Sequence, residues 1–303
     1  SFMDFPYSFL AVVIGLLSGK PAVSTAHGTY SVVPFFSRRW SGLLRWTYRH
    51  LRRVVCISNF TKKEILRKIN IENCITINNG INLDKFNIDE TRNQPEADQP
   101  LAGRKQATKG RRDDSSSKMI LSVGMLKQRK GFHVSLKAVA QVKEKYPNLR
   151  YYIVGRQEDK NYFEKLKQIV KDYNLENSVV FLENISDREL KKLYNQADLF
   201  LLTPVYIKGN FEGFGLVYLE AGAFGKPVVG SLGSGAEEAV VHNETGLLVP
   251  QNDPKATAEA TIKILGNPEL AKKLGQGNKN FTKDHDWERV AKKYQEIYKK
   301  FAS

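Results

Sequence analysis

Two glutamates, Glu212 and Glu220, have a spacing and surroundings that could do chemistry. Glu212 lies in a glycine-rich turn after an apolar, strand-like run at 199–203, and Glu220 lies in a helix-like run that Gly225 ends. A strand that leads through such a turn into a helix leaves backbone N–H groups unpaired, and the helix dipole favours a phosphate there. Carboxylates beside that phosphate would accept hydrogen bonds from sugar hydroxyls. The pattern therefore indicates a nucleotide sugar, although similar turns also occur in α/β domains that bind no ligand.

Further motifs occur in the order that a known family shows. A short strand at 228–230 leads to a glycine turn before Glu238, and a Thr-Gly-Leu-Leu-Val strand follows at 245–249. In this order the chain resembles the retaining glycosyltransferases of family 4, the glycosyl transferases group 1, which have the GT-B fold. Upstream segments resemble other motifs of the same family; they are 25–30, 56–61, 77–82 and 121–131. The resemblance therefore extends over nearly the whole chain.

The predicted fold class is α/β. With 303 residues the chain is long enough for two domains that each bury a core. Strand-like runs alternate with helix-like segments in the C-terminal half, which favours a parallel sheet of the Rossmann type. The resemblance implies a GT-B architecture, in which two Rossmann-like domains with parallel sheets face each other across a cleft. We predict a partial N-terminal domain, a flexible linker, a C-terminal nucleotide-sugar-binding domain and a last helix that packs back on the N-terminal domain; their bounds are 1–88, 89–117, 118–284 and 285–303.

The N-terminal domain is expected to be incomplete. The sequence starts with a helical run at 7–17 and a strand at 22–25, without the opening strand and glycine turn that a complete domain of this fold would have. The apolar part of the helical run lacks a basic flank and is too short to span a bilayer. We therefore predict a helix that covers the sheet.

Basic residues would hold the donor diphosphate if the resemblance is followed residue by residue. Lys130 matches the lysine of the family motif and would neutralise the leaving group. The family usually supplies an arginine directly after the glycine that corresponds to Gly124, and this chain has Met125 there. A thioether cannot bind phosphate as a guanidinium does. Arg129 is therefore predicted to take that role, with Lys127 as the weaker candidate.

The resemblance also implies roles for acidic and neutral residues. Glu212 would face the reacting end of the sugar, and His27 would contact the sugar near the anomeric carbon. Glu220 would accept hydrogen bonds from the ribose hydroxyls, and Glu238 is expected to hold its own glycine turn. The predicted catalytic residues are His27, Arg129, Lys130 and Glu212. Besides Glu220, the predicted donor-binding residues are Gly124, Asn184, Ile185, Gly213, Phe214, Gly215 and Leu216, among which Asn184 and Ile185 would read the base.

The net charge is +15, and basic residues gather near the N-terminus. No Asp or Glu occurs between Asp4 and Glu64, and a helix predicted over 40–54 places arginines opposite an apolar face. Such a helix in the basic stretch Arg38–Arg53 is typical of a peripheral contact with an anionic membrane surface. An ordinary solvated basic face explains the pattern equally well. Nucleic acid is the least favoured partner because no recognisable nucleic-acid-binding module accompanies the charge.

No metal or other cofactor is expected. No Asp-x-Asp pair ends a strand in a donor-binding context, and the five histidines are scattered without ligand spacing. Two cysteines cannot form a disulfide framework and fit a reducing compartment. We therefore expect a cytoplasmic protein that can lie on the cytoplasmic face of the membrane.

The resemblance implies a metal-independent retaining glycosyltransferase that moves a hexose from a nucleoside diphosphate sugar. The long segment at 204–210 favours a donor of mannose or glucose type and a saccharide or lipid-linked acceptor. Two alternatives stay open at this point. One is a GT-B nucleotide-sugar epimerase, and the other is a non-catalytic module that binds a nucleotide or, through its basic surface, a membrane.

Overall fold

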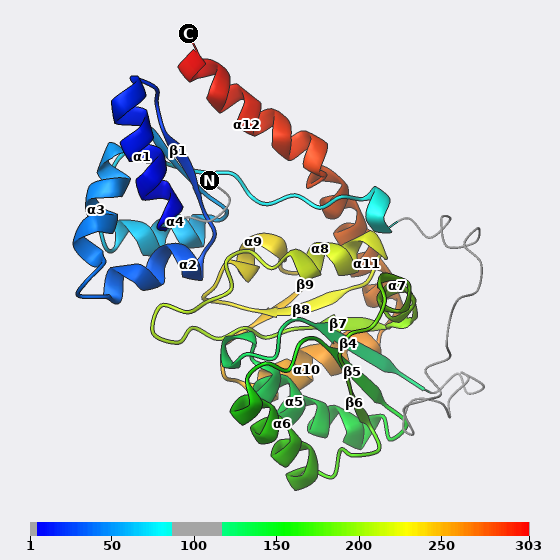
Figure 1. The fold of residues 1–303 in the computed structure, drawn as a ribbon. Helices are drawn as coiled ribbons and strands as arrows, with labels where there is room; N and C mark the ends of the chain where they lie inside the picture. The colour runs from blue at the N-terminus through cyan, green and yellow to red at the C-terminus, as the bar shows by residue number, and fades with distance from the viewer. Residues whose placement is uncertain (1–4, 87–116, 303) are drawn as a thin grey trace.

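The computed structural model describes residues 5–86 and 117–302, which form two Rossmann-like domains with parallel sheets (Figure 1). The predicted linker lies outside the described residues, except for its last residue. The described part of the N-terminal domain contains, in chain order, α1 (Tyr7–Ser18), β1 (Val23–Ala26), α2 (Thr29–Val32), the 3-10 helix η1 (Val33–Phe36), α3 (Ser41–His50), β2 (Arg53–Cys56), α4 (Asn59–Leu66), β3 (Cys74–Thr76) and the 3-10 helix η2 (Asp84–Phe86). The C-terminal domain contains β4 (Met119–Val123), the 3-10 helix η5 (Gln128–Lys130), α5 (Phe132–Lys145), β5 (Arg150–Val154), α6 (Lys160–Asp172), β6 (Val179–Leu182), α7 (Asp187–Gln196), β7 (Leu199–Leu201), α8 (Leu216–Ala223), β8 (Val228–Ser231), α9 (Ala236–Ala239), β9 (Gly246–Val249), α10 (Pro254–Leu265) and α11 (Pro268–Asp284), and α12 (Trp287–Ala302) follows.

The N-terminal sheet, within the described residues, has three parallel strands in the order β1-β2-β3. Side chains alternate between its two faces. One face packs beneath α1, α3 and α4, and its cluster of buried residues includes Val12, Leu44, Val54, Cys56 and Ile65. The helix expected at the start of the chain is present as α1, which contacts both α3 and β1.

The basic helix is shorter than expected, so the prediction of one helix over 40–54 was wrong. α3 ends at His50, Leu51 has an extended backbone, and Arg53 is already part of β2. Val54 and Val55 are β-branched and pair with β1, so their preference for a strand overrides the helical pattern. The Arg45 guanidinium turns inward, where it donates to the Lys68 carbonyl oxygen. Fewer arginines therefore point away from the domain than the helical pattern suggested.

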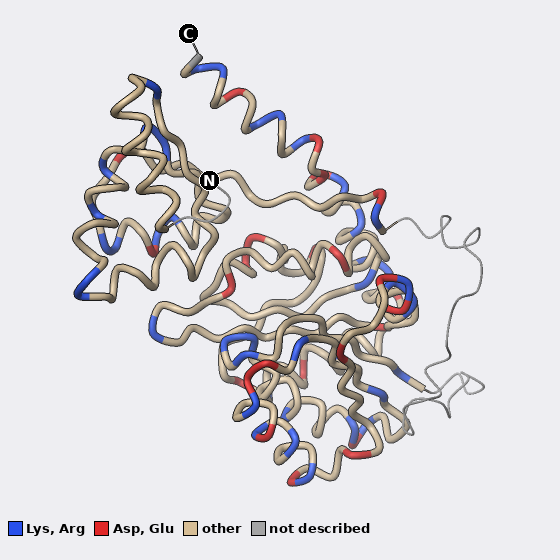
Figure 2. Tube along the Cα trace, viewed as in Figure 1, with Lys and Arg blue, Asp and Glu red and all other residues tan. Residues whose placement is uncertain are grey.

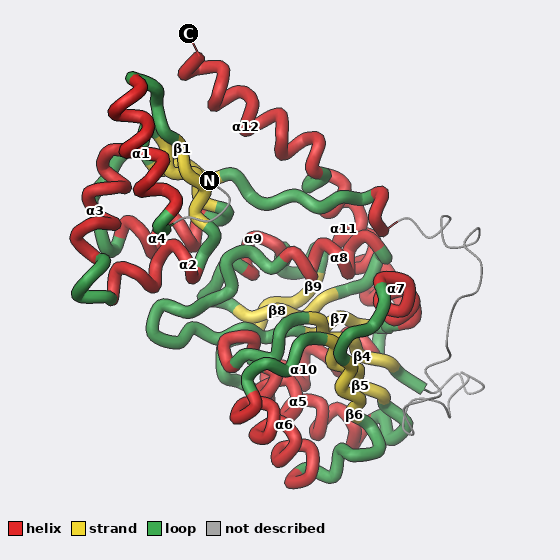
Figure 3. Tube along the Cα trace, viewed as in Figure 1, coloured by secondary structure: helices red, strands yellow, loops and turns green. Residues whose placement is uncertain are grey.

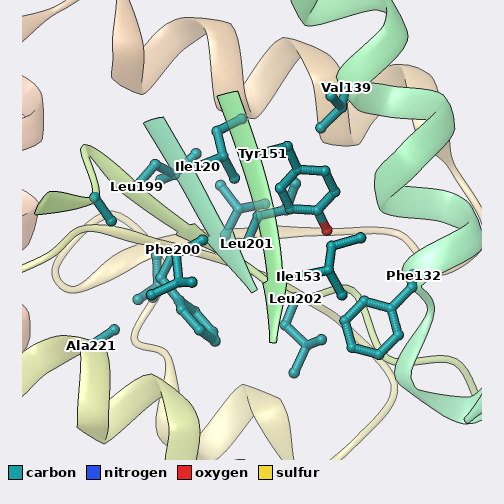
Figure 4. Close-up of a cluster of buried hydrophobic side chains, with 14 of the residues drawn as sticks. Ile120, Phe132, Val139, Tyr151, Ile153, Leu199, Phe200, Leu201, Leu202 and Ala221 are labelled. Carbon is teal, nitrogen blue, oxygen red and sulfur yellow. The ribbon is translucent and has the colours of Figure 1, made fainter. Parts of the chain in front are cut away.

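The C-terminal sheet has six parallel strands in the order β6-β5-β4-β7-β8-β9 within the described residues. Helices α5, α6 and α10 cover one face, and α8 and α11 cover the other (Figure 1). Strands covered on both faces need nearly continuous apolar runs. Figure 4 shows the result at the centre of the sheet, where Ile120, Ile153 and Phe200 are fully buried.

Helix α12 leaves the C-terminal domain and packs on the other face of the N-terminal sheet. Val290 is 2% exposed and clusters with Val55 and Ile77. Two backbone hydrogen bonds join the start of this helix to Ile81, namely Ile81 N–H to the His285 carbonyl oxygen at 2.8 Å and Trp287 N–H to the Ile81 carbonyl oxygen at 3.0 Å. Among the described residues, none of the helices combines the length and the apolar character needed to cross a membrane.

A second connection between the domains is the long loop between β7 and α8, which extends toward the N-terminal domain (Figure 3). Phe211 of this loop is 1% exposed and belongs to the N-terminal core cluster. Its backbone N–H and carbonyl oxygen each form a 2.8 Å hydrogen bond with the Thr29 hydroxyl. The Tyr206 hydroxyl donates to the Glu64 carboxylate at 2.9 Å. The length of this loop therefore serves, in this structure, to join the two domains.

Candidate active site

The site lies where the C-terminal sheet reverses the direction of its strand order. β4 and β7 are neighbours, but β5 and β6 lie beyond β4 whereas β8 and β9 lie beyond β7. In open parallel sheets, ligands bind at the carboxyl ends of the strands at such a switch point. Gly124 directly follows β4, and Thr203 lies two residues after β7. Apart from Asn184 and Ile185, the predicted site residues of the C-terminal domain lie on or after the chain segments that leave these two strands.

Lys130 is positioned by the glycine that follows it. Gly131 has φ +73°, and a Cβ atom on this residue would lie 1.7 Å from the Thr203 carbonyl oxygen, so only glycine fits there. This tight turn directs Lys130 back over Gly124, with the lysine Cε 3.5 Å from where a Cβ on Gly124 would be. Lys130 is only 8% exposed. A buried lysine needs an anionic partner, so a carboxylate or a bound anion must lie beside Lys130.

Glu212 is that partner. One carboxylate oxygen of Glu212, Oε2, lies 2.5 Å from Lys130 Nζ and 3.2 Å from Arg129 Nη1. Burial raises the pKa of Glu212, but the charges and hydrogen bonds of Lys130 and Arg129 together outweigh it and hold the pKa below the ordinary value of 4.5. Glu212 is therefore an anion at neutral pH. The structure thus brings together three of the four predicted catalytic residues.

His27 belongs to the other domain and directly precedes a glycine that contacts the turn carrying Glu212. Gly28 has φ +70°, and a Cβ atom on it would lie 2.7 Å from Gly213 Cα. The glycine turns of the two domains therefore touch directly beside Glu212. His27, one residue before this contact, is half-buried, and burial lowers its pKa below the ordinary value of 6.5. Its imidazole is therefore neutral at neutral pH and can both donate and accept one hydrogen bond.

The start of α8 offers a place for an anion. Gly215, with φ 92°, is the N-cap residue and has no side chain that could cap the helix, so an anionic ligand can take the place of a capping group. Phe214 is 1% exposed and belongs to the C-terminal core. Leu216 is 37% exposed on the first turn of the helix.

Glu220 lies farther along α8 and has a different environment from Glu212. Its carboxylate accepts a 2.8 Å hydrogen bond from the Tyr194 hydroxyl of α7. Burial raises the pKa of Glu220, although this hydrogen bond lowers it in part. The pKa of Tyr194 is well above its ordinary value because of burial and the nearby carboxylate. Tyr194 therefore holds the Glu220 carboxylate in one orientation and leaves its second oxygen for another donor.

Asn184 and Ile185 lie after β6, two strands away from β4. Asn184 is exposed and has φ 55°, a left-handed conformation that asparagine tolerates. Ile185 packs against the C-terminal core. The neighbouring Glu183 accepts a 2.9 Å hydrogen bond from the Gln157 backbone N–H, which fixes this loop to the one after β5. A base-reading role for Asn184 and Ile185 stays a prediction.

Comparison with known proteins decides the family. Residues 104–281 match the family described as glycosyl transferases group 1, and residues 3–85 match glycosyltransferase family 4. The chain belongs to the glycosyl transferases group 1. The resemblance that was predicted from the motifs is therefore confirmed.

Relatives of this group 1 chain include glycosyltransferases of known and unknown specificity. It is 37% identical over 155 residues to the putative colanic acid biosynthesis glycosyltransferase WcaL of Escherichia coli, covering 50% of this chain and 37% of that protein. It is 31% identical over 170 residues to a GDP-mannose-dependent α-(1-6)-phosphatidylinositol monomannoside mannosyltransferase of Mycolicibacterium smegmatis, covering 55% of this chain and 44% of that protein. The chain spans 37–59% of the length of the first three curated relatives that it matches.

Solved structures support the fold. Anabaena HepE in complex with UDP-glucose has a TM-score of 0.78 to this group 1 chain at 19% identity, and the match covers 97% of this chain and 76% of HepE. The sucrose-phosphate synthase of Thermosynechococcus elongatus has a TM-score of 0.72 at 23% identity, and the match covers 97% of this chain and 71% of the synthase. Likeness at this level of identity shows the fold, and the predicted GT-B class is confirmed.

Glu238 has a partner that the sequence of this group 1 chain did not predict. It was expected to hold its own turn, but it is the neighbouring Glu237 that accepts a hydrogen bond from Gly233 N–H of that turn. Glu238 instead accepts from the backbone N–H of Asn59 at 2.8 Å and of Phe60 at 2.9 Å, and from the Asn78 side chain at 3.0 Å. The only indication in the sequence was the predicted start of a helix near Asn59, because the first N–H groups of a helix need acceptors.

Within residues 5–86 and 117–302, no group of three or more His, Cys, Asp or Glu side chains is placed so that it could hold a metal ion.

Proposed function

We propose that this group 1 chain transfers a hexosyl group of mannose or glucose type from a nucleoside diphosphate sugar to a saccharide or lipid-linked acceptor. The transfer retains the anomeric configuration and needs no metal. The observation that carries the proposal is the cluster of Lys130, Arg129 and Glu212 at the switch point between β4 and β7. The relatives include a GDP-mannose-dependent mannosyltransferase, and a structural neighbour was crystallised with UDP-glucose. The sugar nucleotides in the names of these two proteins both carry a hexose, which fits the proposed donor.

The positive charges act on the leaving group. The donor diphosphate competes with the Glu212 carboxylate for Lys130 and Arg129, and the start of α8 adds the positive end of its dipole. Glu212 is then free to accept hydrogen bonds from the sugar hydroxyls. Fixed cations of this kind stabilise the charge that develops as the bond between the anomeric carbon and the phosphate oxygen breaks.

The acceptor attacks from the face that the diphosphate leaves. Its hydroxyl oxygen forms the new bond to the anomeric carbon, and its proton passes to the departing phosphate oxygen, so the configuration is retained. His27, neutral because burial lowers its pKa, orients the sugar at the reacting end. Glu220, held by Tyr194, accepts from the ribose hydroxyls, while Asn184 and Ile185 contact the base.

Thermal stabilisation by UDP, GDP, ADP and their sugars, each with and without EDTA, tests the donor site. One nucleotide should raise the melting temperature equally with and without EDTA, because a ligand that binds only the folded state stabilises it. Lys130→Ala and Glu220→Ala should lose this shift. Lys171→Ala, on the exposed side of α6, should keep it. The absence of any shift would favour the non-catalytic alternative, and an altered sugar released without an acceptor would favour an epimerase.

We further propose that the N-terminal domain rests on an anionic membrane surface at the cytoplasmic face. Ile14 is 63% and Leu17 84% exposed on α1, and α1 packs beside α3. Arg49 and Arg52, at and just beyond the end of α3, are also exposed, and basic segments mark this domain in Figure 2. Apolar and basic side chains on one surface favour binding to anionic lipid headgroups.

Sedimentation with vesicles tests this second proposal. The chain should bind vesicles that contain phosphatidylglycerol, bind less in high salt, and not bind pure phosphatidylcholine. The double variant Ile14→Ser/Leu17→Ser should bind less, whereas Leu66→Ser, at a 37% exposed leucine on α4, should bind as the parent does. Binding to duplex DNA with no binding to vesicles would reject the membrane in favour of nucleic acid.

A further inference from the structure

A pocket of about 350 Å³ lies between the N-terminal sheet and α12. Thr25 and His27 of the β1 segment and Asn79 after β3 form one wall. Trp287, Tyr294 and Tyr298 of α12 form the other. This volume is in the range of small-molecule sites. Among the predicted site residues, His27 lines this pocket and the others do not, so the pocket shares one residue with the candidate active site.

Two contacts connect the walls of the pocket to the turn that carries Glu212. On one wall, His27 precedes Gly28, which touches Gly213 beside Glu212. On the other wall, Trp287 follows His285 by two residues, and the His285 ring lies 6.0 Å from the Phe214 ring. Both walls are therefore linked, through residues close to them in the chain, to the turn that carries Glu212. The end of the pocket that His27 lines is the end that we place next to the donor site.

The chemistry of the walls selects a neutral ligand. None of the described residues that line the pocket carries a carboxylate, an ammonium or a guanidinium group. The polar groups are the imidazole of His27, the indole N–H of Trp287, the Asn79 and Gln295 amides, and the hydroxyls of threonine and tyrosine. The C–H faces of a sugar ring pack on aromatic rings, and its hydroxyls exchange hydrogen bonds with amides and hydroxyls. A diphosphate or a phosphorylated headgroup would lose its hydration here without gaining a cation.

The exposure of the aromatic side chains on α12 also favours a ligand-binding role for this pocket. Val290 and Ile297 of this helix pack on the sheet, as an apolar stripe used for docking should. Trp287 and Tyr298 belong to the same stripe but stay 43% and 52% exposed at the pocket. Large aromatic side chains left accessible beside a pocket are typical of recognition sites.

We propose that this pocket binds the neutral saccharide end of the acceptor, with Trp287 and Tyr298 packing against sugar rings and Asn79 and Gln295 bonding to hydroxyls. The proposal rests on the transferase function proposed above. It assigns α12 a direct part in acceptor recognition, in addition to joining the domains. The acceptor hydroxyl that reacts lies at the end of the pocket next to His27.

Tryptophan fluorescence gives a direct test, because Trp287 is one of three tryptophans in the chain. In the double variant Trp40→Phe/Trp46→Phe, all tryptophan emission comes from Trp287. Methyl α-glucoside, methyl α-mannoside and maltose are the neutral probes, and sodium phosphate is the anionic one. At least one saccharide should change the emission in a saturable way, and phosphate should not.

Ala291→Leu in that background narrows the pocket from the α12 side, because Ala291 lines it. The apparent Kd for the saccharide should rise by about tenfold or more, a difference of about 1.4 kcal/mol. Lys293→Leu, on an exposed position of the same helix, is the matched control and should bind as the background does. Tyr298→Ala, at a half-exposed position, provides a second variant if Ala291→Leu does not fold.

The outcomes separate this proposal from the donor proposal. If no neutral saccharide changes the emission, or if Ala291→Leu and Tyr298→Ala bind as well as Lys293→Leu, the acceptor pocket is wrong. A preference for phosphate also overturns it. Thermal stabilisation by the nucleotide should be unchanged in Ala291→Leu, because Lys130 and Glu212 are untouched. If no nucleotide raises the melting temperature of the parent or of any variant, the donor site is rejected instead.

Discussion

The Glu238 carboxylate of the C-terminal domain accepts a 2.8 Å hydrogen bond from the backbone N–H of Asn59, the first residue of α4 in the N-terminal domain. The same carboxylate accepts from Phe60 N–H at 2.9 Å. A negative charge at the start of a helix satisfies unpaired N–H groups and interacts favourably with the helix dipole. Glu238 therefore holds the two domains together.

Glu238→Ala should loosen the contact between the domains. Loss of these charge-assisted hydrogen bonds should lower the free energy of unfolding by about 1–2 kcal/mol, and small-angle X-ray scattering should show a larger radius of gyration. Glu237→Ala is the matched control, because Glu237 bonds within its own turn and its loss should not change the radius. Equal effects of the two substitutions on the radius would contradict this role.

The two glutamates of the motif should make opposite contributions to the pH dependence of stability. The pKa of Glu212 is lowered in the folded state, so the unfolded state binds more protons. Its contribution to the free energy of unfolding is complete above the ordinary carboxyl pKa and is lost as the pH falls through the lowered value. The pKa of Glu220 is raised, so stability instead decreases as the pH rises from the ordinary value through the raised one.

Urea unfolding between pH 3 and pH 7 measures these signs. As the pH rises, the free energy of unfolding of the parent should increase relative to that of Glu212→Gln. Above the ordinary carboxyl pKa, the free energy of unfolding of the parent should decrease relative to that of Glu220→Gln. Two difference curves with the same slope would show that one of these environments is described wrongly.

Gly28→Ala should disturb the contact between the two glycine turns. The substitution introduces a Cβ 2.7 Å from Gly213 Cα and forces alanine into a left-handed conformation. Gly19→Ala has the same backbone strain, with φ +69°, but nothing lies within 4 Å of its Cβ. The left-handed conformation alone costs about 1–2 kcal/mol. Gly28→Ala should therefore lower the free energy of unfolding by clearly more than Gly19→Ala, and only Gly28→Ala should weaken nucleotide binding.

Arg129 is predicted to supply the guanidinium that Met125 does not. Arg129→Met should weaken nucleotide binding by about tenfold or more, because a hydrogen bond to a charged group contributes about 1.5–3 kcal/mol. Met125→Arg in the Arg129→Met variant should restore part of this affinity. Lys127→Arg in the same variant is the control and should restore none. Isothermal titration with the nucleotide that gives a thermal shift measures all four proteins, and unchanged affinity in Arg129→Met would remove Arg129 from the site.

Local patterns in the sequence were sufficient for the alternation of strands and helices and for the glycine turns that carry the site. The spacing of Glu212 and Glu220 follows from one turn and one helix, and Lys130 precedes a glycine that the tight turn requires. The helix predicted beyond His50 failed because valine residues prefer a strand once β1 is beside them. Pairing with a neighbouring strand is not visible in a helical pattern.

The sequence by itself determined which residue types lie in the glycine turns of the candidate site, because each motif is a short segment whose geometry is set by its own glycines and helix start. Only the tertiary structure decided which segments touch. Glu238 bonds to Asn59, a residue 179 positions away, and Phe211 enters the core of the other domain. Contacts of this kind depend on how the two domains pack, and packing is set by the shape and burial of whole surfaces, which no local spacing records.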